Sequence, residues 1–300
     1  MEIALEYSAI RGCFVRHRGL GFLLVLVLLA ALPQPVRCAE ASADLPGDAS
    51  PGAALDLAAL RAAYPGVVRA LERDASGRLE LVLTSGQRLM YDDGVPRDAK
   101  QALDNPDIRT MLAQVYPLGP VDQASARPAP GFDPGRSRVE ALFIALYGGA
   151  EAEVRASSVK VPFVKRGPLF STRHGAAEAL TRVGKRLSAL EPEQLGPRRI
   201  LWPLGGTIIW RVIAGTGRLS MHSFGVAIDL NPTLPYWRTE PHPETIPGQL
   251  LAFPPEIVAA FEAEGFIWGG KWASFDLMHF EYRPELLLKA RALAGQVTLP

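Results

Sequence analysis

The chain has 300 residues, of which 48% are hydrophobic and 21% are charged, so it can bury a sizeable core and is not disordered throughout. Its formal charge is +1 and becomes −1 without residues 1–38, so the charge gives no indication of a nucleic-acid partner. Cysteine occurs only as Cys13 and Cys38. Residues 39–300 therefore contain no cysteine nucleophile, cysteine zinc ligand or disulfide.

The first 38 residues have the order of a secretory signal peptide: a basic stretch, an apolar run over residues 20–32, and small residues at the exit. The apolar run is short for a membrane span. Val36 and Cys38 suit the −3 and −1 positions of a cleavage site, so we expect an exported protein, periplasmic or secreted, that is cut after Cys38. An uncleaved signal or a lipid on Cys38 would attach the protein to a membrane, but Arg37 does not fit a lipoprotein motif.

Residues 39–54, mainly small residues and proline, are predicted to form a flexible leader, and residues 55–120 a small N-terminal unit of unknown role. The elements expected in this unit are a helix over 55–63, a hairpin of strands 78–83 and 87–91, and helices near 98–103 and 107–116. Residues 121–136 hold prolines and glycines too closely spaced for a regular element, which predicts a linker.

The main domain is predicted over residues 137–300. Helices are expected over 137–147, 175–190, 254–264 and 284–293, and strands over 159–164, 207–213, 227–230 and 277–282. The helix over 175–190 is amphipathic, so one of its faces should be buried.

Two segments carry candidate chemistry: Ser220-Met-His-Ser-Phe-Gly-Val-Ala-Ile-Asp229 and Asp276-Leu-Met-His279. Two imidazoles and one carboxylate form a common catalytic zinc site because they leave a fourth position for water. Gly225 can turn the chain so that Asp229 points back towards His222, and His279 would come from a neighbouring strand. The spacing alone also fits a loop histidine and a strand-end cap.

These segments resemble a family of zinc peptidases that includes VanY-like D-alanyl-D-alanine carboxypeptidases and phage-type L-alanyl-D-glutamate endopeptidases. The family pattern is S-x-H-x-x-G-x-A-x-D followed by [ED]-x-x-H, and every fixed position is matched. Residues 266–272 (FIWGGKW) also resemble the W-G-G-x-W stretch of the endopeptidase branch. The resemblance covers roughly residues 200–285 and leaves residues 39–130 without a match.

The resemblance implies one zinc ion per chain, held by His222, Asp229 and His279, with Asp276 as general base. Strand alternation places Glu281 on the same face as His279, which makes Glu281 a rival base.

The resemblance further implies that Arg211 stabilises the oxyanion, with Arg218 as a second candidate. A strand-face arginine paired with a carboxylate is the alternative for Arg211. Ser220, Trp268 and Trp272 are expected to bind substrate, the tryptophans as walls of a peptide groove, although tryptophans in a glycine-rich loop also occur as local core. Two further histidines, His174 and His242, lie outside both motifs and are expected to have capping or surface roles.

The fold implied is α+β: a small antiparallel sheet bearing the zinc site with packed helices, besides the smaller N-terminal α/β unit. The implied function is zinc-dependent hydrolysis of peptidoglycan stem peptides, as an L-alanyl-D-glutamate endopeptidase or a D-Ala-D-Ala carboxypeptidase. The aspartate base and the tryptophan loop favour the endopeptidase, whereas a carboxypeptidase would need a cation such as Lys271 or Arg211 for the free carboxylate. The alternative is a non-catalytic peptidoglycan-binding or signalling module that retains the zinc groove, whose signature would be a missing base.

Overall fold

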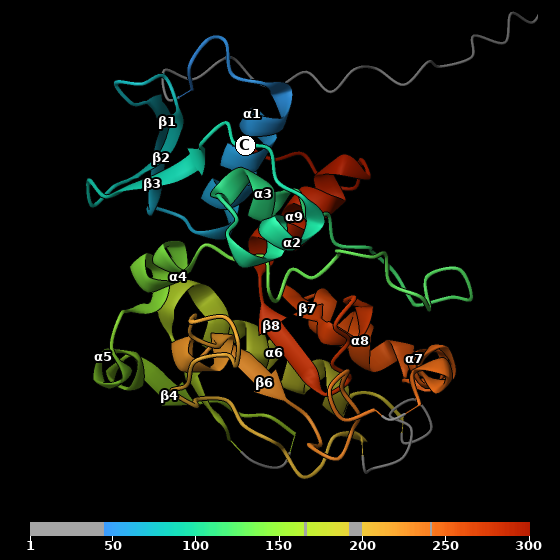
Figure 1. Ribbon diagram of the computed structural model, residues 1–300. Helices are drawn as coiled ribbons and strands as arrows, with labels where there is room; N and C mark the ends of the chain where they lie inside the picture. The colour runs from blue at the N-terminus through green and yellow to red at the C-terminus, as the bar shows by residue number, and fades with distance from the viewer. Residues whose placement is uncertain (1–44, 165–166, 192–199, 241) are drawn as a thin grey trace, which may run out of the picture. The chain divides into compact units, whose positions relative to one another are not determined.

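A computed structural model describes residues 45–164, 167–191, 200–240 and 242–300 (Figure 1). These residues belong to one compact unit, Ala39–Pro300. The expected signal peptide lies outside the described residues. Within the described ranges, no helix has the length and apolar character needed to cross a membrane.

The N-terminal unit combines short helices with a three-stranded antiparallel sheet of order β1-β2-β3. Its elements are α1 (Pro51–Ala63), β1 (Val68–Arg73), β2 (Leu79–Leu83), β3 (Arg88–Asp92), α2 (Ala99–Asp104) and α3 (Ile108–Leu112). The predicted hairpin corresponds to β2 and β3, whereas β1 was not predicted. The helix expected over 107–116 is shorter, because it ends at Leu112.

Helix α1 begins four residues before the expected start, so residues 51–54 are not part of a flexible leader. The Ser50 side chain accepts a hydrogen bond from the backbone N–H of Ala53 at 3.2 Å, and Pro51 occupies the first helical position. Both features start a helix, because the cap satisfies a free N–H and proline has the helical φ already. The helix buries Leu57 and Leu60 and packs on α9 (Pro284–Leu293).

The remaining chain is mixed helix and strand, which confirms the predicted α+β class. Its other helices are α4 (Glu140–Tyr147), α5 (Glu151–Ala156), α6 (Ala176–Ser188), α7 (Ile246–Ala252) and α8 (Pro255–Glu262). Its strands are β4 (Ser158–Lys160), β5 (Leu169–Ser171), β6 (Ala227–Asp229), β7 (Phe266–Trp268) and β8 (His279–Tyr282). Helices α5 and α7 and strands β5 and β7 were not predicted, and the strand expected over 159–164 is shorter.

A three-stranded antiparallel sheet of order β6-β8-β7 carries both motifs. The register places Asp229 opposite His279 and Ala227 opposite Glu281. On this sheet, Phe280 stacks on Phe261 of α8 with ring centroids 3.9 Å apart. The sheet that carries both motifs therefore packs against α8 through aromatic side chains.

The strand expected over 207–213 is wrong, because this segment makes only the isolated bridge of Val212 with Leu219. Its polar groups bind a nearby turn instead: the N–H of Arg211 donates to Ser223 Oγ at 3.0 Å, and the N–H of Ile209 donates to the carbonyl of His222 at 3.3 Å. The apolar run is thus a support for the turn that carries His222.

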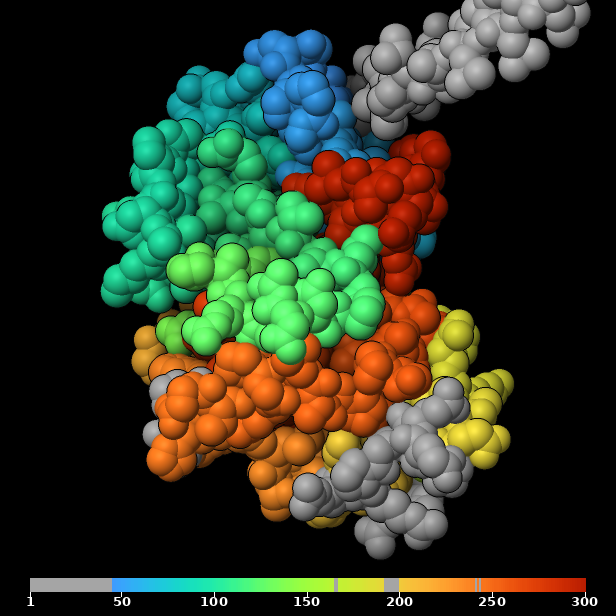
Figure 2. Space-filling model, turned by 90° about the vertical axis from the view of Figure 1, so that its right-hand side faces the viewer, coloured from blue at the N-terminus to red at the C-terminus, as the bar shows by residue number. Residues whose placement is uncertain are grey.

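Residues 121–136, the expected linker, have no regular element but pack against the C-terminal part of the chain. The N–H of Ala273 donates to the carbonyl of Phe132 at 2.7 Å, and Asp133 is buried. Figure 2 shows the green surface that follows the N-terminal unit lying directly against the orange surface of the C-terminal part. The division into a separate unit, linker and peptidase domain stays a prediction.

Candidate metal centre

His222, Asp229 and His279 are brought together by a turn and two paired strands. A 3₁₀ turn, Met221–Phe224, carries His222, and it is followed by Gly225 at φ +67°, a left-handed conformation that glycine adopts without strain. The chain then enters β6, which ends at Asp229, and β8 begins at His279 opposite it. The strand register therefore decides where two of the three side chains meet.

One atom from each of the three side chains converges on a common point. Asp229 Oδ1 lies 2.7 Å from His279 Nδ1 and 3.2 Å from His222 Nε2, and the two ring nitrogens are 3.3 Å apart. Both histidines are buried, and Asp229 is partly buried. The three potential ligand atoms all lie within 4.8 Å of one another, so the cluster has the size of a metal-binding site.

The second nitrogen of each imidazole has its own hydrogen-bond partner. His222 Nδ1 lies 3.3 Å from the carbonyl of Thr207, and His279 Nε2 lies 3.0 Å from Glu281 Oε1. A carbonyl or carboxylate at one nitrogen favours the tautomer whose lone pair is on the other nitrogen. His222 Nε2 and His279 Nδ1, the nitrogens that face Asp229, are therefore the candidate ligand atoms, and two imidazoles with one carboxylate suit zinc.

Neighbouring charges within the cluster shift the pKa values of Asp229 and His279. Burial opposes the charged form of Asp229, but the two histidines hold its pKa well below the usual range. Burial likewise opposes a charge on His279, yet Asp229 and Glu281 raise the pKa of this imidazole well above its ordinary value. The site therefore attracts positive charge.

Asp276 lines the same cavity as Asp229 and His279. Burial raises its pKa to about 7, and the negative charge of Asp229 acts in the same direction. Asp276 Oδ1 is buried and has no hydrogen-bond partner among the described residues. Gly269 allows this approach, since an added Cβ would lie 2.7 Å from the Asp276 carbonyl oxygen. Asp276 thus offers a carboxylate that can exchange a proton in the cavity.

Glu281, the rival base, is engaged by His279. Its Oε1 binds the ring nitrogen that faces away from Asp229, and the residue is only 3% exposed. Burial would raise the pKa of Glu281, but the hydrogen bond with His279 and the charge of Arg138 keep it below its usual range. This geometry favours a supporting role for Glu281 and leaves Asp276 as the better base.

Two other predicted residues, Ser220 and Arg211, line the cavity, whereas Arg218 does not. Ser220 caps the turn of His222, whose N–H lies 3.4 Å from Ser220 Oγ. Arg211 is exposed, and its guanidinium forms no ion pair with any residue that the structure describes. By contrast, Arg218 is partly buried and donates to the carbonyls of Leu103 and Arg138 at 2.9 and 3.2 Å. Arg211 is therefore the better placed of the two arginines for a substrate.

The two tryptophans separate into a cavity residue and a core residue. Trp272 lines the cavity, and its ring stands edge-on to His279 at a centroid distance of 5.5 Å. Trp268 is 1% exposed, packs on Phe253 and donates from Nε1 to the carbonyl of Leu277 at 3.0 Å. The expected groove-wall role of Trp268 is corrected accordingly, because its ring is enclosed by core side chains.

Lys271 also lies away from the cavity and cannot receive a substrate carboxylate there. Its buried ammonium binds Glu262 Oε1 at 2.6 Å and the carbonyls of Pro117 and Gly119 at 2.9 and 2.6 Å. All three of its donor positions are thereby used within the chain.

The two other histidines that the structure describes, His174 and His242, lie outside the metal cluster. His174 Nε2 lies 2.9 Å from the carbonyl of Leu146, and its ring is edge-on to Tyr64 and Tyr147. His242 is exposed beside Glu244. Neither histidine contributes a ligand atom to the group formed by the zinc motif.

Sequence reasoning missed several cavity residues. They are Asp133, Gly135 and Arg136 from the expected linker, and Tyr236, Trp237 and Arg238 after β6. A Cβ at Gly135 would come within 2.3 Å of the Trp272 ring, so the chain there needs glycine. No local pattern reveals this, because the two residues are far apart in sequence.

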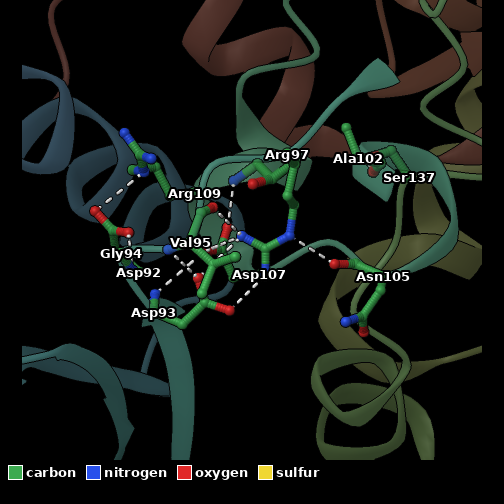
Figure 3. Close-up of polar contacts among 11 residues, drawn as sticks. Asp92, Asp93, Gly94, Val95, Arg97, Ala102, Asn105, Asp107, Arg109 and Ser137 are labelled. Atoms are coloured by element: carbon green, nitrogen blue, oxygen red, sulfur yellow. Dashed lines mark hydrogen bonds and ion pairs between the residues drawn. The ribbon is translucent and has the colours of Figure 1, made fainter. Parts of the chain in front are cut away.

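A second acidic group, Asp92, Asp93 and Asp107, is already neutralised by arginines (Figure 3). Arg97 binds Asp93 at 2.5 Å and Asp107 at 3.1 Å, and Arg109 lies 3.1 Å from Asp92. These pairs fasten β3 to α3. Within the described ranges, the motif cluster is thus the acidic group better suited to a metal.

Comparison with known protein families agrees with the position of the cluster. Residues 214–282 match the model of a family described as D-alanyl-D-alanine carboxypeptidase. This segment contains the three clustered ligand residues, Asp276 and both tryptophans. No curated protein and no solved structure shows significant similarity to the chain.

Proposed function

We propose that the chain is a zinc-dependent hydrolase of peptidoglycan stem peptides, because residues 214–282 match the model of a family described as D-alanyl-D-alanine carboxypeptidase. One observation carries the proposal: His222, Asp229 and His279 converge in a cavity that is also lined by the partly buried carboxylate of Asp276. A non-catalytic wall-binding module would not need such a carboxylate.

Zinc, when bound, lowers the pKa of water and polarises the carbonyl of the scissile bond. The chain supplies the other functions. Asp276 takes up the proton that the attacking water loses and donates it to the leaving amine. Arg211 stabilises the negative charge that develops on the carbonyl oxygen, and Trp272 walls the cavity against bulk water.

The substrate is proposed to be a stem peptide cut at a bond next to a D-amino acid. Lys271 is engaged with Glu262, so it is not available for a substrate carboxylate. The cations that line the cavity are Arg211, Arg136 and Arg238. Three arginines at one cavity suit stem peptides, which are rich in carboxylates.

Mass spectrometry of muropeptides incubated with the purified protein tests the proposal. We expect cleavage that stops with a chelator and returns with zinc, and metal analysis showing one zinc per chain. Release of terminal D-alanine would establish a carboxypeptidase, whereas cleavage after L-alanine would establish an endopeptidase. His222→Ala should lose the metal and the activity, whereas the exposed His242→Ala should keep both. Cleavage that is insensitive to chelator, or no cleavage by zinc-loaded protein, would refute the proposal.

A further inference from the structure

A series of buried polar side chains leads from α1 towards the metal centre. Tyr64, the C-cap residue directly after α1, donates its hydroxyl hydrogen to Glu285 Oε2 at 2.6 Å. The other oxygen of Glu285 accepts a hydrogen bond from Arg283 Nε at 2.5 Å. All three residues are fully buried, each with 0% exposure. The first links of the series therefore join the N-terminal unit to the start of α9.

The series continues from Arg283 to a predicted zinc ligand. Arg283 NH1 forms an ion pair with Glu281 Oε2 at 3.7 Å, and Glu281 Oε1 binds His279 Nε2 at 3.0 Å. The guanidinium of Arg283 is also fixed by the carbonyl of Pro134 at 3.0 Å and by the face of Phe143, 4.9 Å away. Because these groups are buried, water screens their charges only weakly.

We propose that Tyr64 is a positioning residue for His279, acting through Glu285, Arg283 and Glu281. The N-terminal unit is then a part of the metal centre's support. The inference rests on the proposed function, because it takes His279 as a zinc ligand.

The physical reason is that each member of the series holds the next. A carboxylate on the second nitrogen of a ligand histidine sets the orientation of the ring and the basicity of the other nitrogen. Arg283 contributes, together with Arg138, to balancing the charge of Glu281, and Glu285 fixes the side of the Arg283 guanidinium that carries Nε. Without the hydroxyl of Tyr64, a buried carboxylate oxygen of Glu285 loses its partner, and the whole network must readjust.

The test compares two tyrosine-to-phenylalanine variants of the full chain. Tyr64→Phe removes the first link, whereas Tyr91→Phe removes a similar buried bond, from Tyr91 to Asp56 Oδ2 at 2.8 Å, that does not belong to the series. Zinc dissociation constants are measured by competition with a chelator, and the visible spectrum of the cobalt-loaded protein reports ligand geometry. Glu281→Gln should weaken zinc binding about 10- to 100-fold, and Tyr64→Phe, three partners further away, about 3- to 10-fold.

We expect Tyr91→Phe to keep the wild-type zinc affinity and cobalt spectrum, even where it unfolds at lower denaturant than the wild type. The double variant Tyr64→Phe/Glu281→Gln should bind zinc no more weakly than Glu281→Gln alone, because both changes act on one route. Losses that multiply in the double variant, or equal zinc affinities of the two tyrosine variants, would overturn the inference and leave the proposed function standing. Wild-type protein without stoichiometric zinc would overturn the proposed function itself.

Discussion

At the scale of single residues, the candidate site depends on which atom of each side chain is left free. The two histidines use opposite nitrogens: His222 turns Nε2 towards Asp229, whereas His279 turns Nδ1. Thr207 and Glu281 take the remaining nitrogens. The three side-chain atoms that remain lie close together and form a compact set of potential metal ligands.

The base role of Asp276 leads to a prediction at this scale. Asp276→Asn keeps the size of the side chain but cannot accept the proton, so the variant should retain zinc and lose about 10²- to 10⁴-fold in kcat. Metal analysis and muropeptide turnover measure the two effects separately.

Glu281→Gln is the matched comparison, since Glu281 supports His279 and its loss should appear first in zinc affinity. Near wild-type turnover by Asp276→Asn, together with a zinc-loaded but inactive Glu281→Gln, would transfer the base role to Glu281.

At the scale of elements, the loop between β7 and β8 places Asp276 through a close contact of main chains. The turn Gly269–Lys271 follows β7, and the N–H of Asp276 donates to the carbonyl of Gly269 at 3.0 Å. Each strand at the site is only three or four residues long, so such loop contacts rather than long ladders hold the residues of the candidate site.

Gly269→Ala should therefore disturb the site. The new methyl group would lie 2.7 Å from the Asp276 carbonyl oxygen and 3.1 Å from its Cβ, which forces the loop to move. We expect a loss of about 1–3 kcal/mol in the free energy of unfolding, together with reduced turnover.

Gly248→Ala is the control, because a Cβ there meets nothing within 4 Å and the residue lies in α7. Alanine favours a helix, so this variant should be as stable as the wild type or about 0.4–1 kcal/mol more stable. Denaturant unfolding and muropeptide assays compare the two variants. Equal behaviour of both would show that the Gly269 contact does not position Asp276.

At the scale of the whole molecule, the N-terminal unit and the C-terminal part share buried polar contacts. Tyr116 donates to Glu262 Oε1 at 2.6 Å and accepts from the N–H of Trp268 at 3.0 Å. Lys289 of α9 forms an ion pair with Asp56 of α1. A buried polar group without a hydrogen-bond partner is costly. Truncation of the N-terminal unit would leave Glu262 and Lys289 either exposed to water or buried without these partners.

Export is the prediction that concerns the full chain. The order of a basic stretch, an apolar run and small exit residues predicts cleavage after Cys38 in a bacterial host. N-terminal sequencing of the exported protein should begin at Ala39. Retention in the cytoplasm would contradict the signal, and a diacylglycerol on Cys38 would establish the lipoprotein alternative.

The sequence by itself determined the α+β class and identified the four residues that lie together at the site. The motif with His222 and Asp229 and the motif with Asp276 and His279 identified these residues through their resemblance to a known family. One strand register, with Asp229 opposite His279, then joins the two motifs. Their chemical roles remain predictions for the experiments above.

Only the tertiary structure decided which residues surround that centre. Trp268 and Trp272 are four positions apart and both are buried, yet only Trp272 lines the cavity. Residues 207–213 looked like a strand because they are apolar, but their polar groups pair with a turn. Asp133 comes from the expected linker, and Tyr64 lies 215 positions before His279, yet both lie close to the centre or to its supporting network. Such contacts depend on which surfaces meet during folding, and neither composition nor periodicity within a segment encodes the identity of a distant partner.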